Sequence, residues 1–124
     1  MKYEVFQIRL SDACRDAIEI CNRTGSPERA AELYPEYRAH MNASLGKYQD
    51  GDFRHYSYVA TIEATSLQEV FDIGNIGPES AIERHRPMHS ISVGDIILDS
   101  EQRFHLVAPI GFRDVTRTPI GAVA

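Results

Sequence analysis

The stretch from Met88 to Phe112 constrains the fold of this chain more than any other. It contains two short apolar runs, Asp95–Leu98 and Arg103–Ala108, joined by a polar four-residue turn. Apolar runs connected by so short a polar segment predict a β-hairpin, in which the two strands are antiparallel. Such a hairpin can anchor a sheet, but it contains no nucleophile–base pair, no metal-ligand spacing and no phosphate-binding loop.

Two more segments alternate between apolar and polar residues, which is the pattern of a half-buried strand. The first is Tyr3–Leu10. The second is Phe53–Ala64, which we interpret as a central strand of the sheet. One side of this second strand is expected to hold Tyr56, Tyr58, Ala60 and Ile62.

Helical spacing of apolar residues predicts helices at about 12–23 and 27–45, and a shorter one at about 67–74. Pro35 falls in the middle of the second helix, so we expect a kink or a break into two short helices there. The predicted ends are marked by residue types that cap or terminate helices, namely Ser11 or Asp12, Gly25, Pro27, Gly46, Ser66, Glu69 and Gly74.

The resulting element order, β-α-α-β-α-β-β, predicts an α+β fold. We expect a small antiparallel or mixed sheet of about four strands, with two or three helices packed on one face. A chain of 124 residues can form one domain that buries about two-thirds of its unfolded surface. The predicted domain covers residues 1–113, and residues 114–124 are expected to form a flexible tail.

The lack of a targeting signal in the sequence and the positions of the two cysteines favour a cytoplasmic protein without a membrane partner. No apolar run approaches the roughly 18 residues of a membrane-spanning helix, and the first ten residues lack a signal-peptide core. Cys14 and Cys21 share one face of a predicted helix but lie about 10 Å apart along it, beyond disulfide reach. We interpret both as small core residues in a reducing compartment.

The residues that could do chemistry do not form a known catalytic or metal pattern. His85 and His89 would suit a zinc pair on a helix, but Pro87 lies between them and no third ligand is evident nearby. Asp95 and Asp99 could face the same side of a strand, yet carboxylates at strand ends usually cap turns. We therefore expect no catalytic residue, no metal and no cofactor.

Two surfaces are candidates for contact with a protein partner. Glu28, Glu32 and Glu36 form an acidic row at helical spacing, with Tyr37 beside it, and a solvated helix face is the alternative interpretation. The polar loop around residues 84–89 could hold an anion or an acidic partner, because guanidinium groups bind carboxylates and phosphates well. Its candidate residues are Arg84, Arg86 and His89.

A different class of function is nucleic-acid binding. Tyr56 and Tyr58 could stack on bases, with Arg54 nearby and the loop arginines supplying charge. The net charge of −5 argues against a general affinity for phosphate backbones, and the apolar neighbours of both tyrosines favour core packing. A small β-barrel of the ASCH or PUA-like kind is the structural analogy for this alternative.

Three motifs resemble the YodL-like domain family. They are SLQEVFDIGN at 66–75, SVGDII at 92–97 and the segment from Phe104 to Phe112, together within about residues 55–113. The resemblance implies a small accessory protein of a phage or mobile element, which acts by binding a host component. It brings no catalytic residues, and residues 12–45 have no counterpart in it.

The leading hypothesis from the sequence is a non-enzymatic protein-binding module that inhibits or modulates a host protein, for example in the manner of an anti-CRISPR protein. The alternative is the single-stranded nucleic-acid-binding domain. An edge strand in a small sheet would also allow a homodimer.

Overall fold

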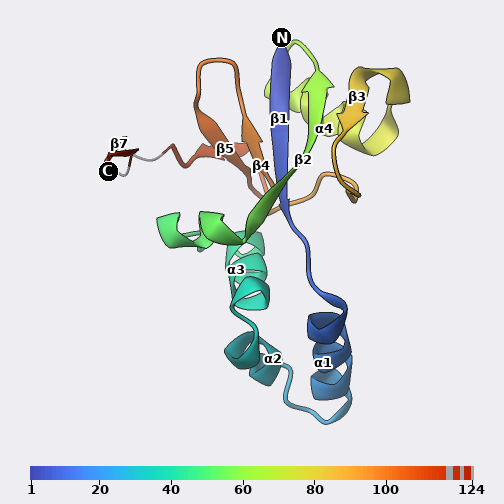
Figure 1. The fold of residues 1–124 in the computed structure, drawn as a ribbon, viewed down its shortest axis with the longest axis vertical. Helices are drawn as coiled ribbons and strands as arrows, with labels where there is room; N and C mark the ends of the chain where they lie inside the picture. Colours follow the sequence, from blue (N-terminus) through green and yellow to red (C-terminus); the bar gives the residue numbers. More distant parts are fainter. Residues whose placement is uncertain (117–118, 121, 124) are drawn as a thin grey trace.

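Strand β1 lies at the centre of a six-stranded antiparallel sheet with the order β3-β2-β1-β4-β5-β6 (Figure 1). The computed structural model describes residues 1–116, 119–120 and 122–123. The predicted α+β class is confirmed, but the sheet has six strands rather than about four. The strands of the sheet are β1 (Lys2–Ile8), β2 (Tyr56–Glu63), β3 (Ile82–Arg84), β4 (Ile96–Leu98), β5 (Phe104–Val107) and β6 (Phe112–Asp114).

The two strands that the sequence did not predict lie at the edges of the sheet. β3 pairs with β2, and β6 pairs with β5. Each is three residues long, which is too short for an alternating pattern to stand out from a loop. The predicted hairpin is present as β4 and β5, with Ile97 opposite His105.

A β-bulge divides β2 into two parts that present different faces. Val5 of β1 is opposite Ala60 and Phe6 is opposite Tyr58, so Val59 has no partner residue on β1. The extra residue reverses the alternation of side chains. The prediction that Tyr56, Tyr58, Ala60 and Ile62 lie on one side of this strand is therefore wrong. Tyr56 packs in one core cluster and Ala60 in the other.

Both faces of the sheet are covered, which corrects the prediction that helices would pack on one face only. Successive strand residues point to opposite faces, and Val5 and Phe6 of β1 belong to different clusters. Helix α4 (Leu67–Ile76) covers the Val5 face, where it buries Val70 and Ile73. The Phe6 face is covered by the end of helix α3 (Pro35–Ser44), the segment that follows it and the 3-10 helix η1 (Asp50–His55).

Three short helices form an arm that extends away from the sheet (Figure 1). They are α1 (Asp12–Arg23), α2 (Glu28–Leu33) and α3 (Pro35–Ser44). The predicted break at Pro35 is confirmed, because Tyr34 is extended and Pro35 begins α3. The predicted capping residue Ser11 accepts a hydrogen bond from the amide of Cys14 at 3.1 Å. These three helices, α1, α2 and α3, are called the arm below.

The last described part of the chain continues the sheet beyond the predicted domain boundary at residue 113. β6 extends to Asp114, and the amide of Val115 donates to the carbonyl of Phe104 at 2.8 Å. The amide of Phe104 in turn donates to Thr116 Oγ1 at 2.8 Å. Further on, β7 (Pro119–Ile120) and β8 (Ala122–Val123) form a parallel pair, and residues 117, 118, 121 and 124 of the predicted tail lie outside the described residues.

The remaining short element is the 3-10 helix η2 (Glu79–Ala81), which leads into β3. No helix in the part of the chain that the structure describes is long and apolar enough to cross a membrane.

Candidate functional site

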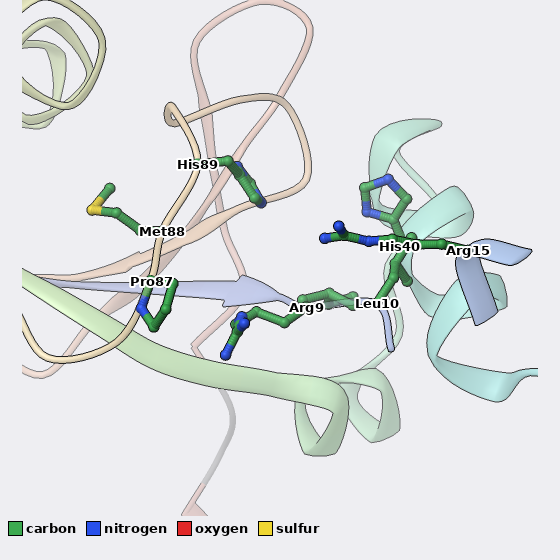
Figure 2. A pocket seen from close by; sticks show the side chains of 8 residues that line it. Arg9, Leu10, Arg15, His40, Pro87, Met88 and His89 are labelled. Carbon is green, nitrogen blue, oxygen red and sulfur yellow. The ribbon is translucent and has the colours of Figure 1, made fainter. Parts of the chain in front are cut away.

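A pocket of about 380 Å³ lies where the chain leaves β1 and enters the arm (Figure 2). Its walls come from three places far apart in the sequence: the end of β1 with the start of α1, helix α3, and the loop that precedes β4. The lining residues are Ile8, Arg9, Leu10, Arg15, His40, Pro87, Met88 and His89.

Four of the eight lining residues are basic or become so on protonation, and none is acidic. Arg15 and His89 point toward one another from opposite sides of the pocket, with His40 next to Arg15 (Figure 2). The position of each follows from its element, because Arg9 comes just after β1, Arg15 is on α1 and His40 is on α3. The pocket therefore collects positive charge at the junction of the arm and the sheet.

Hydrogen bonding defines how His89 can act in the pocket. Its Nδ1 lies 2.8 Å from the carbonyl oxygen of Ser90. A carbonyl oxygen only accepts, so Nδ1 is the nitrogen that bears the proton in this bond. Nε2 then becomes a donor only when the ring is protonated to imidazolium.

His40 is partly buried, and its surroundings disfavour a positive charge on the ring. Burial lowers its pKa, and the neighbouring His89 lowers that pKa further, because both oppose a positive charge on the ring. An anion bound next to the His40 ring would have the opposite effect and would favour its protonated state.

A buried polar pair beneath the pocket fixes the loop that bears His89. Gln7 is 0% exposed, and its Nε2 donates to Asp95 Oδ2 and to the carbonyl of His89, both at 2.9 Å. The amide of His89 donates back to Gln7 Oε1 at 3.2 Å. The side chain of Gln7 thus satisfies both backbone groups of His89, which positions the loop against β1.

Asp95 completes this buried pair. Its Oδ2 also accepts from the amide of Ser92 at 2.9 Å and lies 4.0 Å from His89 Nδ1. Burial raises the pKa of Asp95 to about 6, although the hydrogen bonds from Ser92 and Gln7 and the nearby His89 work in the other direction. The carboxyl group is thus poised to titrate near the same pH as a histidine.

An apolar strip on α3 adjoins the basic pocket. Tyr37, Met41 and Leu45 follow one another at intervals of four residues, so they lie on one face of the helix. With His40 and Ser44 they line a second, shallower hollow of about 250 Å³. His40 lines both hollows, which makes the strip and the pocket one continuous surface.

The structure places two of the predicted partner-binding residues in this surface, Tyr37 in the strip and His89 in the pocket. It does not bring the others there. Glu28 and Glu32 are exposed on α2, while Glu36 is half-buried on α3, so the break at Pro35 interrupts the predicted acidic row.

The two predicted loop arginines are engaged elsewhere. Arg84 forms an ion pair with Glu79, with 2.5 Å between Nη1 and Oε1. Arg86 donates from Nη1 to the carbonyl of Tyr58 at 2.7 Å. The first interaction joins β3, to which Arg84 belongs, to η2 (Glu79–Ala81), and the second holds the loop to β2; neither arginine lines the pocket.

Sequence reasoning missed Arg9, Arg15 and His40 as site residues. Both arginines are exposed, like most arginines, so neither stands out as a site residue. They line the same pocket as His40 because the chain turns between β1 and α1 and α3 returns beside that turn. No spacing in the sequence encodes that tertiary contact.

The other groups singled out from the sequence have structural surroundings. His85 Nε2 lies 2.9 Å from Thr61 Oγ1, and its ring contacts that of Tyr58 with centroids 4.7 Å apart. Among the described residues there is no group of three or more side chains that could hold a metal ion. Cys14 and Cys21 are buried, as predicted, and burial raises the pKa of the Cys14 thiol.

The aromatic pair proposed to stack on bases is packed within the protein. Tyr56 lies against Phe53 and Tyr48, and its hydroxyl donates to the carbonyl of Gly94 at 2.5 Å. The ring of Tyr58 contacts Phe6 on one side of the sheet. These rings therefore do not present the open platform that base stacking requires.

The chain matches no protein-family model, no curated protein and no solved structure. The resemblance of residues 55–113 to the YodL-like domain family accordingly stays a prediction.

Proposed function

We propose that this chain is a non-enzymatic protein-binding module, and that its contact surface is the apolar strip of α3 together with the adjoining basic pocket. The observation that supports this proposal is that the arm contributes almost nothing to the hydrophobic core of the sheet. Ala43 is the only described arm residue in the two clusters that form the core of the sheet. The rest of α1, α2 and α3 is thus free to serve another purpose.

The apolar residues of the arm fit a contact surface. The buried positions of the arm are occupied by small residues, namely Cys14, Cys21, Ala30, Ala39 and Ala43. Larger apolar side chains remain outside, and Leu45 at the end of the strip is 65% exposed. Apolar side chains exposed next to one another are typical of protein contact surfaces.

The chemistry of the surface defines the partner that would fit it. An apolar side chain of the partner would lie on the strip, and an acidic group beside it would enter the pocket. A host protein is the expected partner, modulated by a phage or mobile-element accessory protein. That context comes from the resemblance alone.

A capture experiment from a bacterial lysate tests this proposal. Wild-type protein on a solid support should retain a specific protein at physiological salt, and Leu45→Glu should lose it because a carboxylate replaces the exposed apolar group. Ile110→Glu is the matched control, because Ile110 is 94% exposed in the turn between β5 and β6. Retention of the same proteins by Leu45→Glu and wild type, or no specific retention at all, would contradict the proposal.

A further inference from the structure

We propose that the basic pocket formed by Arg9, Arg15, His40 and His89 is a binding site for a tetrahedral oxyanion of the phosphate class. This inference rests on the proposed function only for the question of which molecule presents the oxyanion. Binding of the anion itself is a property of the pocket and can be measured on the isolated protein.

The first argument is that no acidic side chain lines the pocket, the nearest carboxylate being that of the buried Asp95 beneath His89. The chain has 18 acidic and 13 basic residues, and three arginines form ion pairs within the described residues, Arg23 with Glu19, Arg84 with Glu79 and Arg103 with Asp114. The guanidinium groups of Arg9 and Arg15 make no ion pair or hydrogen bond within the described residues, and no acidic residue lines the pocket. In an acidic protein, such a concentration of unpaired positive charge indicates a site for an external anion.

The second argument is the type of donor. Guanidinium groups present several N–H donors in a planar fork, which matches the oxygens of phosphate and sulfate, and these charge-assisted hydrogen bonds are the strong ones. Imidazolium rings add donors from the α3 side and the loop side. Arg15, His40 and His89 face one space from α1, α3 and the loop, whereas the Arg9 guanidinium points away from them and adds only its charge (Figure 2). Donors from three elements suit a tetrahedral anion better than a planar carboxylate, which two donors from one direction can satisfy.

The third argument is that the pocket is held in place before a ligand arrives. Gln7 fixes both backbone groups of His89 at 2.9 and 3.2 Å. His40 is supported by the Tyr37 ring, with centroids 6.4 Å apart in a stacked arrangement. Preorganised donors lower the entropy lost on binding.

Affinity should rise as the pH falls. His40 lies beside Arg15 of α1 and faces the loop that bears His89 (Figure 2), Arg9 lines the same pocket, and the His40 ring stacks on Tyr37 of its own helix. Protonation of His40 adds a donor and positive charge, and protonation of Asp95 beneath His89 removes the nearest buried negative charge. Both changes act in the same direction as the pH falls.

Sulfate is the best probe, because its charge stays constant between pH 6 and pH 8. We expect sodium sulfate to cause saturable NMR shifts at Arg15, His40 and His89 that sodium chloride of equal ionic strength does not cause. The dissociation constant should be lower at pH 6 than at pH 8. Arg15→Gln should weaken binding about tenfold or more, as expected for the loss of a hydrogen bond between charged groups, whereas Arg23→Gln on the same helix should not.

Several results would overturn the inference. They are shifts of equal size with chloride, equal affinity of wild type and Arg15→Gln, and acetate binding as tightly as sulfate, since acetate is a planar carboxylate. Arg15 and Arg23 are both exposed, so neither substitution should prevent folding.

The source of the oxyanion is decided by comparing inorganic phosphate with a short phosphoserine peptide that has a leucine next to the phosphoserine. If a partner protein presents the group, the peptide should bind more tightly than inorganic phosphate, and Leu45→Glu should remove only the extra affinity. Equal affinities would show that the pocket binds the free ion. Loss of protein capture from a lysate with intact sulfate binding would contradict the proposed function but leave the anion site standing.

Discussion

At the scale of single residues, the buried pair of Gln7 and Asp95 links the sheet to the pocket. Gln7→Leu keeps an apolar side chain at this position but removes its amide group, which leaves the amide and carbonyl of His89 and a carboxylate oxygen without this partner. Unsatisfied buried polar groups are costly, so we expect a loss of about 2–4 kcal/mol in the free energy of unfolding, measured by urea denaturation. Gln68→Leu on the exposed side of α4 is the control and should change it by less than about 0.5 kcal/mol. Similar losses for the two variants would show that Gln7 has no special role.

A second prediction for a single residue concerns Asp95 and the pH dependence of the free energy of unfolding. Because burial raises the pKa of Asp95 to about 6, the folded protein holds this proton more tightly than the unfolded chain does. The contribution of this proton to the free energy of unfolding is fully present below about pH 4. It is lost as the pH rises through 6, a change of about 3 kcal/mol. Asparagine does not titrate, so the stability of Asp95→Asn relative to wild type should rise by about that amount between pH 4 and pH 7.5. A difference that stays constant with pH in chemical denaturation would contradict this assignment.

At the scale of elements, the contact between the arm and the sheet depends on Gly94. Its φ is +98°, and an added Cβ would lie 3.3 Å from Ala43 Cβ and from the amide nitrogen of Ser44, at the end of α3. Gly25 is the matched control, because its φ is +78° but nothing lies within 4 Å of an added Cβ. Both alanine substitutions should cost about 1 kcal/mol for the backbone conformation, and Gly94→Ala should cost about 1–2 kcal/mol more for the steric contact. Equal losses in thermal or chemical unfolding would mean that α3 does not pack closely on the Gly94 turn.

The elements also show what the sequence could and could not reveal about the fold. Local signals predicted the helices well, because Ser11, Ser66 and Pro35 act within one helical turn. The short edge strands β3 and β6 depend on pairing with distant strands, so no local pattern marks them. The bulge at Val59 likewise results from pairing with β1 and reverses the side-chain alternation that the sequence suggested.

At the scale of the whole molecule, the sheet and the arm have different roles. The sheet has its own core on both faces, and the arm adds a surface on which a basic pocket meets an apolar strip. His89 and Tyr37 could be predicted as site residues from the sequence, because loop histidines and surface tyrosines are common in binding sites. Arg9, Arg15 and His40 could not, because only the folded chain brings them together.

Site-specific photo-crosslinking in living bacteria tests the central claim, binding of a host protein through the α3 strip, most directly. A photoreactive amino acid at position 45 lies on the strip, and the same amino acid at position 110 lies on a distant exposed turn. Our proposal predicts one crosslinked host protein from position 45 that is absent from position 110 and is diminished when Tyr37→Ala is added. No crosslinked protein from position 45, or the same products from both positions, would contradict it.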